Sequence, residues 1–423
     1  MREPGSRVAF VTLGCKVNRV EAEQVAAELL PCGGALADQP DADVVVVTAC
    51  AVTMEASHKS RKAVRHALAL ANRPTVVVTG CLTDSDVEAL AALSDRVVVE
   101  RDKSALAATV RAAAGLEDVF GVVAPRYGEG FRTRALVKIQ DGCDNRCAYC
   151  IVPFTRGAPR SVPVERVLRD VRSLAAAGVK EVVLTGINVG RYDDGGVDLA
   201  GLIARVADTG VPRVRLTSIE PPDLTERFIR VVSATPAFVE HLHVPLQSGC
   251  DRTLEAMGRR YSAKEYERAI EAAREAMPGL AVTTDVICGF PGESDDDARQ
   301  SEEFVERLAF AKLHVFRYSR RPGTAAAGLV GQVSPGIAAE RAARMRAIGG
   351  ASRQRFLEEQ AGRDAEVLVE SVSGEALHGT ARNGARVRVA GVEASVGDLV
   401  RARIVGVDGD TLVGAPIEAP RFA

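Results

Sequence analysis

The feature that most constrains the fold is a repeated alternation of short apolar runs with amphipathic stretches. The first 115 residues contain three β-branched runs, "RVAFVTL" (7–13), "DVVVVTA" (43–49) and "TVVVTG" (75–80). Such runs are typical of strands that are buried on both faces of a parallel sheet. The stretches 18–30 and 55–71, which lie between them, have the spacing of amphipathic helices. This βαβαβ order predicts a doubly wound parallel sheet.

After a linker-like segment, "APRYGEGF" (124–131), the same alternation resumes. Helical stretches such as 163–178 and 262–277 separate the apolar runs. The candidate strands are residues 134–139, 180–185, 213–218, 239–244, 281–287 and 312–317. About six β/α units in this length predict a complete or partial barrel, with its chemistry at the carboxyl ends of the strands.

The last part of the chain changes character. Residues 335–358 have the pattern of an Arg-rich helix, in which Gly349-Gly350 is a candidate break. Its arginines fit either a solvated helix face or a contact with RNA. From residue 360 onward the spacing is that of short strands with Gly-rich turns, which predicts a small antiparallel β-barrel of a kind that often binds oligonucleotides. We therefore expect three domains, at residues 1–118, 129–358 and 360–423.

Composition narrows the class of protein. The 423 residues are 47% hydrophobic and 26% charged, which is typical of a soluble globular protein. No segment approaches the ~18 apolar residues of a membrane span, and "MREPGSRVAF" at the N-terminus has no long apolar stretch, so we expect a cytoplasmic protein. The formal net charge is −2, so any contact with nucleic acid must rest on local basic patches.

Three of the nine cysteines are clustered in "GCDNRCAYC". Without an export signal, metal or redox chemistry is a better explanation for them than a disulfide framework. Cys143, Cys147 and Cys150 have the spacing C-x3-C-x2-C, one ligand short of a closed tetrahedral zinc site. An iron–sulfur cluster with one iron left open fits this count. A non-catalytic, zinc-bearing RNA-binding protein is the alternative from a different class.

Three other cysteines each follow one of the first three candidate strands. Cys15 ends "TLGC", Cys50 ends "VTAC" and Cys81 ends "VTGC". Because the carboxyl ends of parallel strands share one edge of a sheet, these thiols can converge on a single site. The positions of these three cysteines are explained equally well if they are only small side chains buried at the strand ends. The remaining Cys32, Cys250 and Cys288 have no ligand-like pattern and are interpreted as packing or incidental thiols.

Polar segments follow the candidate barrel strands in register, including "TGIN" (185–188), "TSIEP" (217–221), "PLQSG" (245–249) and "GFPGES" (289–294). Each alone fits an ordinary turn, but together they fit the functional rim of a barrel. The three histidines that flank these strands, His241, His243 and His314, are interpreted as structural.

The spacing of the clustered cysteines resembles that of the radical S-adenosylmethionine enzymes, in which an aromatic residue, here Tyr149, precedes the third cysteine. The resemblance implies a [4Fe–4S] cluster whose open iron binds the amino and carboxylate groups of S-adenosyl-L-methionine. Reductive cleavage then yields a 5′-deoxyadenosyl radical, which abstracts hydrogen from unactivated C–H bonds.

Across essentially the whole chain, "LGCKVN", "TACAVT", "IQDGCDNRCAYCIVPFTRG" and a terminal β-barrel together resemble the methylthiotransferases within that superfamily. The resemblance implies that Cys15, Cys50 and Cys81 hold a second [4Fe–4S] cluster, which supplies or carries the inserted sulfur. It also implies that the terminal barrel is a TRAM-like domain, which binds tRNA.

Within that family, "LTGINVGRY", "HLHVPLQSG" and "HVFRYSRRPGTAA" most resemble the branch that acts on N6-threonylcarbamoyladenosine in tRNA. The branch that acts on N6-isopentenyladenosine usually has Gln-Met where this chain has Lys16-Val17, and the branch that acts on a ribosomal protein usually has proline after the first cysteine. Departures from the family pattern are Ala49 and Gly258, where asparagine is usual, and a missing aromatic in "TARNGARV" (380–387).

The resemblance implies two uses of S-adenosyl-L-methionine, as radical source and as methyl donor, with sulfur inserted at C2 of the adenine beside the anticodon. Candidate contacts of this cofactor, besides the catalytic cysteines, are Tyr149, Thr185, Gly186, Asn188, Glu220, Gln247, Ser248, Asp285 and Arg317. Expected partners are the tRNA anticodon stem-loop and an electron donor such as flavodoxin or ferredoxin. We expect a monomer that does not bind membranes.

Overall fold

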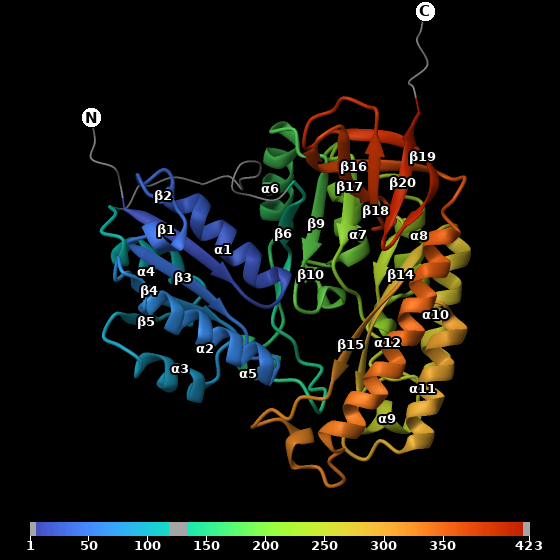
Figure 1. The fold of residues 1–423 in the computed structure, drawn as a ribbon, viewed down its shortest axis with the longest axis horizontal. Helices are drawn as coiled ribbons and strands as arrows, with labels where there is room; N and C mark the ends of the chain where they lie inside the picture. Colours follow the sequence, from blue (N-terminus) through green and yellow to red (C-terminus); the bar gives the residue numbers. More distant parts are fainter. Residues whose placement is uncertain (1–5, 118–132, 418–423) are drawn as a thin grey trace, which may run out of the picture.

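The computed structural model describes residues 6–117 and 133–417, coloured in Figure 1. The expected linker at 124–131 lies outside the described residues. The fold class expected from the sequence is confirmed: a parallel sheet is followed by an open β/α barrel and then by a small closed β-barrel. Figure 1 shows the first part in blue at the left, the open barrel in green to orange, and the closed barrel in red.

The first part is a five-stranded parallel sheet in the order β2-β1-β3-β4-β5. Its strands are β1 (Arg7–Thr12), β2 (Ala35–Leu36), β3 (Val44–Ala49), β4 (Thr75–Gly80) and β5 (Val97–Val99). Its helices are α1 (Lys16–Leu29), α2 (Met54–Leu68), α3 (Asp84–Ala91) and α4 (Leu106–Ala113), with a 3-10 turn η1 (Gln39–Asp41). Apolar side chains of α1 and α4 cover one face of the sheet and those of α2 and α3 cover the other. Every residue of β3 is buried, as expected for the central strand of a doubly wound sheet.

All six candidate barrel strands are present, in two parallel sheets of three, ordered β12-β9-β6 and β13-β14-β15. They are β6 (Ala135–Lys138), β9 (Glu181–Thr185), β12 (Arg213–Leu216), β13 (His241–His243), β14 (Ala281–Cys288) and β15 (Lys312–Arg317). A parallel bridge from Val214 to Phe238 joins the two sheets. The barrel is therefore partial, with β6 and β15 as its two edges.

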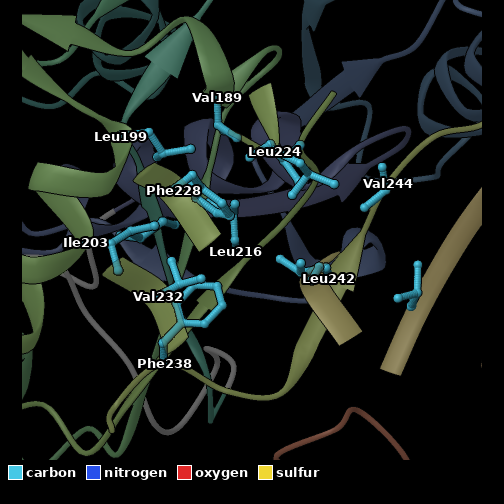
Figure 2. Close-up of a cluster of buried hydrophobic side chains, with 14 of the residues drawn as sticks. Val189, Leu199, Ile203, Leu216, Leu224, Phe228, Val232, Phe238, Leu242 and Val244 are labelled. Carbon is cyan, nitrogen blue, oxygen red and sulfur yellow. The ribbon is translucent and has the colours of Figure 1, made fainter. Parts of the chain in front are cut away.

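Helices cover the outer face of this partial barrel. They are α6 (Val164–Ala176), α7 (Leu199–Ala207), α8 (Glu226–Ser233), α9 (Asp251–Ala256), α10 (Ala263–Ala276), α11 (Asp295–Leu308) and α12 (Pro335–Glu358). Shorter elements are α5 (Val152–Arg156), η2 (Val189–Arg191), η3 (Pro221–Asp223), η4 (Ala325–Gly328), β7 (Gln140–Asp141), β8 (Arg160–Ser161), β10 (Asp193–Asp194) and β11 (Val197–Asp198). Part of the largest core, where these helices meet the strands, is drawn in Figure 2, including Phe228 and Leu242.

The candidate break at Gly349-Gly350 is wrong, because α12 runs without interruption from Pro335 to Glu358. A Cβ on Gly349 would lie 3.0 Å from the Leu313 Cβ of β15. The glycine therefore allows the helix to approach the strand closely. Three of the helix arginines, Arg341, Arg344 and Arg353, form ion pairs within the protein.

The C-terminal part is a closed barrel in the order β16-β17-β18-β20-β19. Its strands are β16 (Asp364–Ser373), β17 (Ala376–Ala381), β18 (Arg386–Ala390), β19 (Leu399–Asp408) and β20 (Thr411–Pro416). The barrel departs from the expected antiparallel pattern at one place, since β18 and β20 pair in parallel. Its β17, "ALHGTA", was not among the expected strands, because glycine and alanine are poor strand formers.

The first part of the chain lies across the open side of the partial barrel, as Figure 1 shows. At the β6 edge, Lys138 Nζ donates to Glu21 Oε1 of α1 at 2.9 Å. Beyond the β15 edge, the backbone N–H of Met54 donates to Ser319 Oγ at 2.9 Å. The carboxyl ends of two parallel sheets are thereby brought face to face. No helix within residues 6–117 and 133–417 is long and apolar enough to cross a membrane.

Candidate functional site

The clustered cysteines, Cys143, Cys147 and Cys150, occupy the loop that follows β7, at the carboxyl end of the first barrel strand. Gly142, which begins the loop, has a φ of +74°. A Cβ at this position would lie 2.1 Å from the carbonyl oxygen of Ala158. Glycine is therefore required here both for the backbone conformation and for the close approach of the segment between α5 and β8.

Two of these sulfur atoms accept hydrogen bonds from other loops of the rim. Asn188 Nδ2 lies 3.6 Å from Cys143 Sγ, and Arg259 Nη1 lies 3.2 Å from Cys147 Sγ. Burial raises the pKa of the Cys143 thiol, and it raises the pKa of Cys150 to about 12. A metal held by these cysteines would stabilise the charged thiolates and would displace the thiol protons. The N–H donors would then stabilise the sulfur ligands.

Arg259 connects the cysteine loop to the rim carboxylate predicted from the sequence. Its guanidinium forms a salt bridge with Glu220, and its Nε donates to the hydroxyl oxygen of Tyr261 at 3.0 Å. Cys147, Glu220 and Arg259 line a cavity of about 90 Å³ together with Asp223. Burial, supported by the charge of Glu220, raises the pKa of Asp223 to about 6.

Two buried polar atoms in the loops that follow β9 and β12, Asn188 Oδ1 and Thr217 Oγ1, have no hydrogen-bond partner among the residues that the structure describes. Buried polar atoms are normally paired, so these two fit contacts with a polar ligand. The loop that carries Asn188 is fixed from below, since Gln140 Oε1 accepts hydrogen bonds from the backbone N–H groups of Ile187 (3.1 Å) and Asn188 (2.8 Å). Donors, acceptors and both charges thus surround the cysteine loop, as a zwitterionic cofactor requires.

The other rim residues expected from the sequence differ in their placement. Thr185 is buried at the end of β9, and Gly186 allows close approach to Gln140, whose carbonyl oxygen would lie 2.9 Å from an added Cβ. The ring of Tyr149 stacks edge-on against Phe290, with ring centroids 6.4 Å apart. These residues shape the rim and hold its loops in place.

Gln247 has a φ of +69°, a conformation that non-glycine residues rarely adopt outside functional or strained sites. Its backbone N–H donates to the carbonyl oxygen of Asp285 on β14 at 2.8 Å. The neighbouring Ser248 is buried, and its hydroxyl bonds to Ser301 Oγ of α11 at 2.9 Å, which ties two outer elements together. Arg317 is exposed at the end of β15.

Cys15, Cys50 and Cys81 follow β1, β3 and β4, which are neighbours in the first sheet. A Cβ on Gly14 would lie 3.0 Å from Cys50 Sγ, so the first loop reaches the second. Burial, with smaller effects from the charges of Cys81 and Cys15, raises the pKa of Cys50 to about 11. Burial likewise raises the pKa of Cys15. The three thiols lie within electrostatic reach of one another at one edge of the sheet.

Asn18 holds two of these loops together. Its Nδ2 donates to the carbonyl oxygens of Leu13 (2.8 Å) and Ala49 (3.0 Å), the residues near Cys15 and Cys50. Its Oδ1 accepts a hydrogen bond from Arg156 of α5. The first turn of α1 therefore fixes the spacing of the cysteine loops.

Arg156 joins the dispersed cysteines to the barrel. Its Nε donates to Cys81 Sγ at 3.1 Å, and its Nη1 contacts Glu21 Oε1 (2.8 Å) and Asp141 Oδ1 (3.0 Å). The side chain is 1% exposed. Burial opposes its charge, but the Cys81 thiolate and Glu21 outweigh burial and raise the pKa of Arg156. The guanidinium is therefore permanently charged beside the sulfur atom.

The structure contains a compact group of potential metal ligands. Among the described residues, the one group of three whose ligand atoms all lie within 4.8 Å of one another is His243, Asp285 and His314. At the local cysteine loop, three thiols with an open fourth position are the ligand set that fits an iron–sulfur cluster.

Sequence reasoning missed four residues that organise the site: Asn18, Gln140, Arg156 and Arg259. Arg156 and Asn18 stand within quoted motifs, at "FTRG" and "CKVN", so their proximity to the cysteines was a usable signal. Arg259 follows the cysteine loop by more than 100 residues and reaches Cys147 only through the barrel fold.

Comparisons with known proteins agree with this geometry. Residues 137–305 match the Radical SAM superfamily, and residues 7–99 match the uncharacterized protein family UPF0004. The structure resembles the radical S-adenosylmethionine methyltransferase TsrM from Kitasatospora setae, with a TM-score of 0.55 and 14% identity over 76% of this chain and 77% of that chain. At this identity the likeness establishes the fold.

Curated relatives align over nearly the whole chain. A threonylcarbamoyladenosine tRNA methylthiotransferase, MtaB, from Bacillus subtilis is 34% identical over 94% of this chain and 93% of the relative. A protein of the same name from Chlamydia pneumoniae is 35% identical over 96% of this chain and 97% of the relative. A tRNA-2-methylthio-N(6)-dimethylallyladenosine synthase from Maricaulis maris is 32% identical over 99% of this chain and 98% of the relative.

The match to the Radical SAM superfamily implies S-adenosyl-L-methionine and a [4Fe–4S] cluster, and the cysteine loop at the carboxyl end of the barrel provides three thiols for such a cluster. The chain therefore belongs to the radical S-adenosylmethionine family of tRNA methylthiotransferases.

Proposed function

We propose that this protein inserts a methylthio group at C2 of N6-threonylcarbamoyladenosine in tRNA, next to the anticodon. The product is 2-methylthio-N6-threonylcarbamoyladenosine. The observation that carries the proposal is the pair of cysteine triads, one at the carboxyl end of the first sheet and one at the carboxyl end of the partial barrel, with the buried Arg156 between these two parts. Relatives from Bacillus subtilis and Chlamydia pneumoniae, each aligned over more than nine-tenths of the chain, carry the name of this activity.

The two triads take different roles in this proposal. Cys143, Cys147 and Cys150 hold the cluster that binds S-adenosyl-L-methionine. Cys15, Cys50 and Cys81 hold a second [4Fe–4S] cluster, which supplies or carries sulfur. The support for the second cluster is that these three thiols, of which Cys50 and Cys81 are buried, lie at one sheet edge, where the guanidinium of Arg156 donates to a sulfur atom.

When bound, the cluster and cofactor at the first triad supply an organic radical that can remove hydrogen from an unactivated C–H bond. The residues of the chain position the reactants. Asn188, Glu220 and Arg259 offer an acceptor, a carboxylate and a guanidinium beside the cysteine loop, which fit the amino and carboxylate groups of the cofactor. Tyr149 packs against Phe290 and limits the access of water from that side.

The overall change breaks the C2–H bond of adenine and forms a C2–S bond, with a methyl group transferred to sulfur. S-adenosyl-L-methionine serves both as the source of the radical and as the methyl donor. The reaction needs electrons from outside the protein, for which we propose a small one-electron donor such as flavodoxin or ferredoxin. We propose that the protein acts as a monomer and that the C-terminal barrel, which is TRAM-like, contacts the anticodon stem-loop.

A second candidate substrate is N6-isopentenyladenosine in tRNA. It is favoured by the Maricaulis maris relative, a tRNA-2-methylthio-N(6)-dimethylallyladenosine synthase that aligns over 99% of the chain. The two substrates differ in one group, since threonylcarbamoyl is polar and anionic and isopentenyl is apolar. The walls of the barrel should therefore distinguish them.

Mass spectrometry of tRNA nucleosides tests the proposal. Cells that lack this gene should contain N6-threonylcarbamoyladenosine without its methylthio derivative, and re-expression of the protein should restore the derivative. A protein in which Cys147 is replaced by alanine is the matched control and should not restore it. Accumulation of N6-isopentenyladenosine in place of its methylthio form would assign the second substrate instead.

A further inference from the structure

Three polar side chains line the inner face of the partial barrel between the two triads. His243, Asp285 and His314 lie on the neighbouring parallel strands β13, β14 and β15, with Asp285 and His314 directly paired in register. Along these strands Leu242 and Val286 alternate with them and are buried in the core beneath the outer helices. Because successive side chains of a strand point to opposite faces, the side chains of His243, Asp285 and His314 face the lumen of the barrel.

The three groups form one connected cluster. His243 Nδ1 lies 2.9 Å from Thr283 Oγ1, which fixes the ring, and His243 Nε2 lies 3.3 Å from Asp285 Oδ1. The rings of His243 and His314 are 5.7 Å apart. The side chains of His243 and Asp285 are 16% and 26% exposed, and His314 is exposed. They therefore offer hydrogen-bonding capacity to a ligand in the lumen.

Positively charged side chains lie near this cluster. Lys312 on β15 and Lys16 at the start of α1 both act electrostatically on His314, and Lys16 also acts on His241. Arg215 of β12 faces His241 but is paired with Glu181. Burial, with His243 and these lysines, lowers the pKa of His314 against the opposing effect of Asp285.

Two imidazoles and one carboxylate are also a composition found in divalent metal sites. The ligand of this cluster could therefore be a divalent metal ion or an organic anion. The nearby lysines favour the anion, because their charges repel a dication and attract an anion. An apolar ligand would cover these polar groups without replacing their hydrogen bonds to water, which is unfavourable. A ligand with a carboxylate and additional donors fits this part of the lumen.

We propose that His243, Asp285 and His314 bind the anionic threonylcarbamoyl group of the substrate and thereby select it over isopentenyl. This inference rests on the proposed function. The threonyl carboxylate accepts a hydrogen bond from the imidazole of His314. The hydroxyl and urea N–H groups donate to Asp285, which His243 holds in place through its Nε2. The isopentenyl group offers none of these partners. A site that is built to hydrogen-bond its substrate rejects an analogue that lacks the polar groups far more strongly than an apolar pocket rejects a size change.

The test uses reconstituted holoenzyme and synthetic anticodon stem-loops that differ only at N6: threonylcarbamoyl, its methyl ester and isopentenyl. Product formation and RNA binding are measured for the wild type, His314→Phe and Asp285→Asn, with His66→Phe on the exposed face of α2 as the matched control. For His314→Phe we expect kcat/KM on the threonylcarbamoyl RNA to fall about 10- to 100-fold, because a hydrogen bond to a charged group is lost. His314→Gln should recover part of this loss.

Binding separates recognition from a general loss of activity. The wild type should bind the acid more tightly than its methyl ester, and His314→Phe should bind both alike, with iron content unchanged. The inference would be overturned if His314→Phe preferred the acid over the methyl ester as strongly as the wild type does. It would also be overturned if the wild type bound one equivalent of zinc or manganese and both His314→Phe and Asp285→Asn lost it. If the wild type instead modifies only the isopentenyl RNA, the proposed function itself fails.

Discussion

The two cysteine triads place three thiols each at the carboxyl end of a parallel sheet, but they are built in opposite ways. Cys143, Cys147 and Cys150 come from one loop, and Gly142 sets its backbone path. The other triad comes from three loops, which Asn18 holds together through carbonyl oxygens on two of them. The local triad therefore depends on a loop, whereas the dispersed triad depends on the whole sheet.

The environments differ as well. At the local triad, Arg259 and Asn188 approach the sulfur atoms from barrel loops, beside a cavity of about 90 Å³. At the dispersed triad, the charge of Arg156 is neutralised by Glu21 and Asp141 and is shielded from solvent. Polar atoms without a partner near the local triad suit the binding of a polar cofactor, whereas the cation beside the dispersed triad is already balanced by carboxylates.

The largest expected effect comes from removing one thiol of either triad. Cys147→Ala should abolish formation of 5′-deoxyadenosine and of methylthiolated RNA, because cofactor cleavage depends on the local cluster. Cys81→Ala should abolish the methylthiolated RNA and still form 5′-deoxyadenosine. Chromatography of both products from one reaction checks this. Loss of cofactor cleavage in Cys81→Ala, with the local cluster intact by its iron content, would show that the triads do not act separately.

Replacing Arg156 should affect the dispersed triad more than the local one. In Arg156→Leu, Glu21 and Asp141 stay buried without their main counter-ion, although Lys138 still contacts both. Breaking a buried ion pair in this way costs about 3 kcal/mol of unfolding free energy. Denaturant unfolding measures the loss, and Arg156→Lys, which keeps the charge and loses the planar fork, should lose less. An unchanged midpoint for Arg156→Leu would contradict the role of this network.

Arg259 should matter for cofactor binding at the local triad. Arg259→Leu removes the donor to Cys147 and the partner of Glu220, so we expect the KM for S-adenosyl-L-methionine to rise about 10-fold or more. The rate of 5′-deoxyadenosine formation at varied cofactor concentration measures it. Arg268→Leu, at an exposed position of α10, is the matched control. Equal KM values in the two variants would exclude the proposed contact.

The smallest expected effect is on stability and concerns Asp223 at the open site. Its pKa is raised to about 6 by burial and by Glu220, so the folded state favours the protonated carboxyl. The protonated carboxyl makes its full contribution to the free energy of unfolding at pH values below the pKa of Asp223 in the unfolded chain. This contribution is lost as the pH rises through about 6. Asp223→Asn should therefore match the wild type near pH 4 and exceed it by about 1–2 kcal/mol at pH 8. Thermal unfolding at both pH values measures the difference, and a constant difference would contradict the raised pKa.

The comparison also explains what the sequence could reveal. The local triad can be read directly from its spacing, and the three buried strands that carry the dispersed triad are apparent from their β-branched runs. The partners of the polar residues that complete each site could not be predicted. Arg156 stands in the motif of the local triad but contacts Cys81, 75 positions away, and Arg259 reaches Cys147 across 112 positions. The histidines illustrate the same limit. Their place on β13 and β15 suggested structural roles, and only the register of the barrel strands brings them around Asp285.

The central claim is that the two triads hold two separate four-iron clusters, and iron analysis tests it most directly. After anaerobic reconstitution, the wild type should contain about eight irons per chain. The Cys15→Ala/Cys50→Ala/Cys81→Ala variant should contain about four, as should the variant that lacks Cys143, Cys147 and Cys150. Mössbauer spectra and acid-labile sulfide should follow the iron count. Full iron content in the first of these variants would contradict the second cluster.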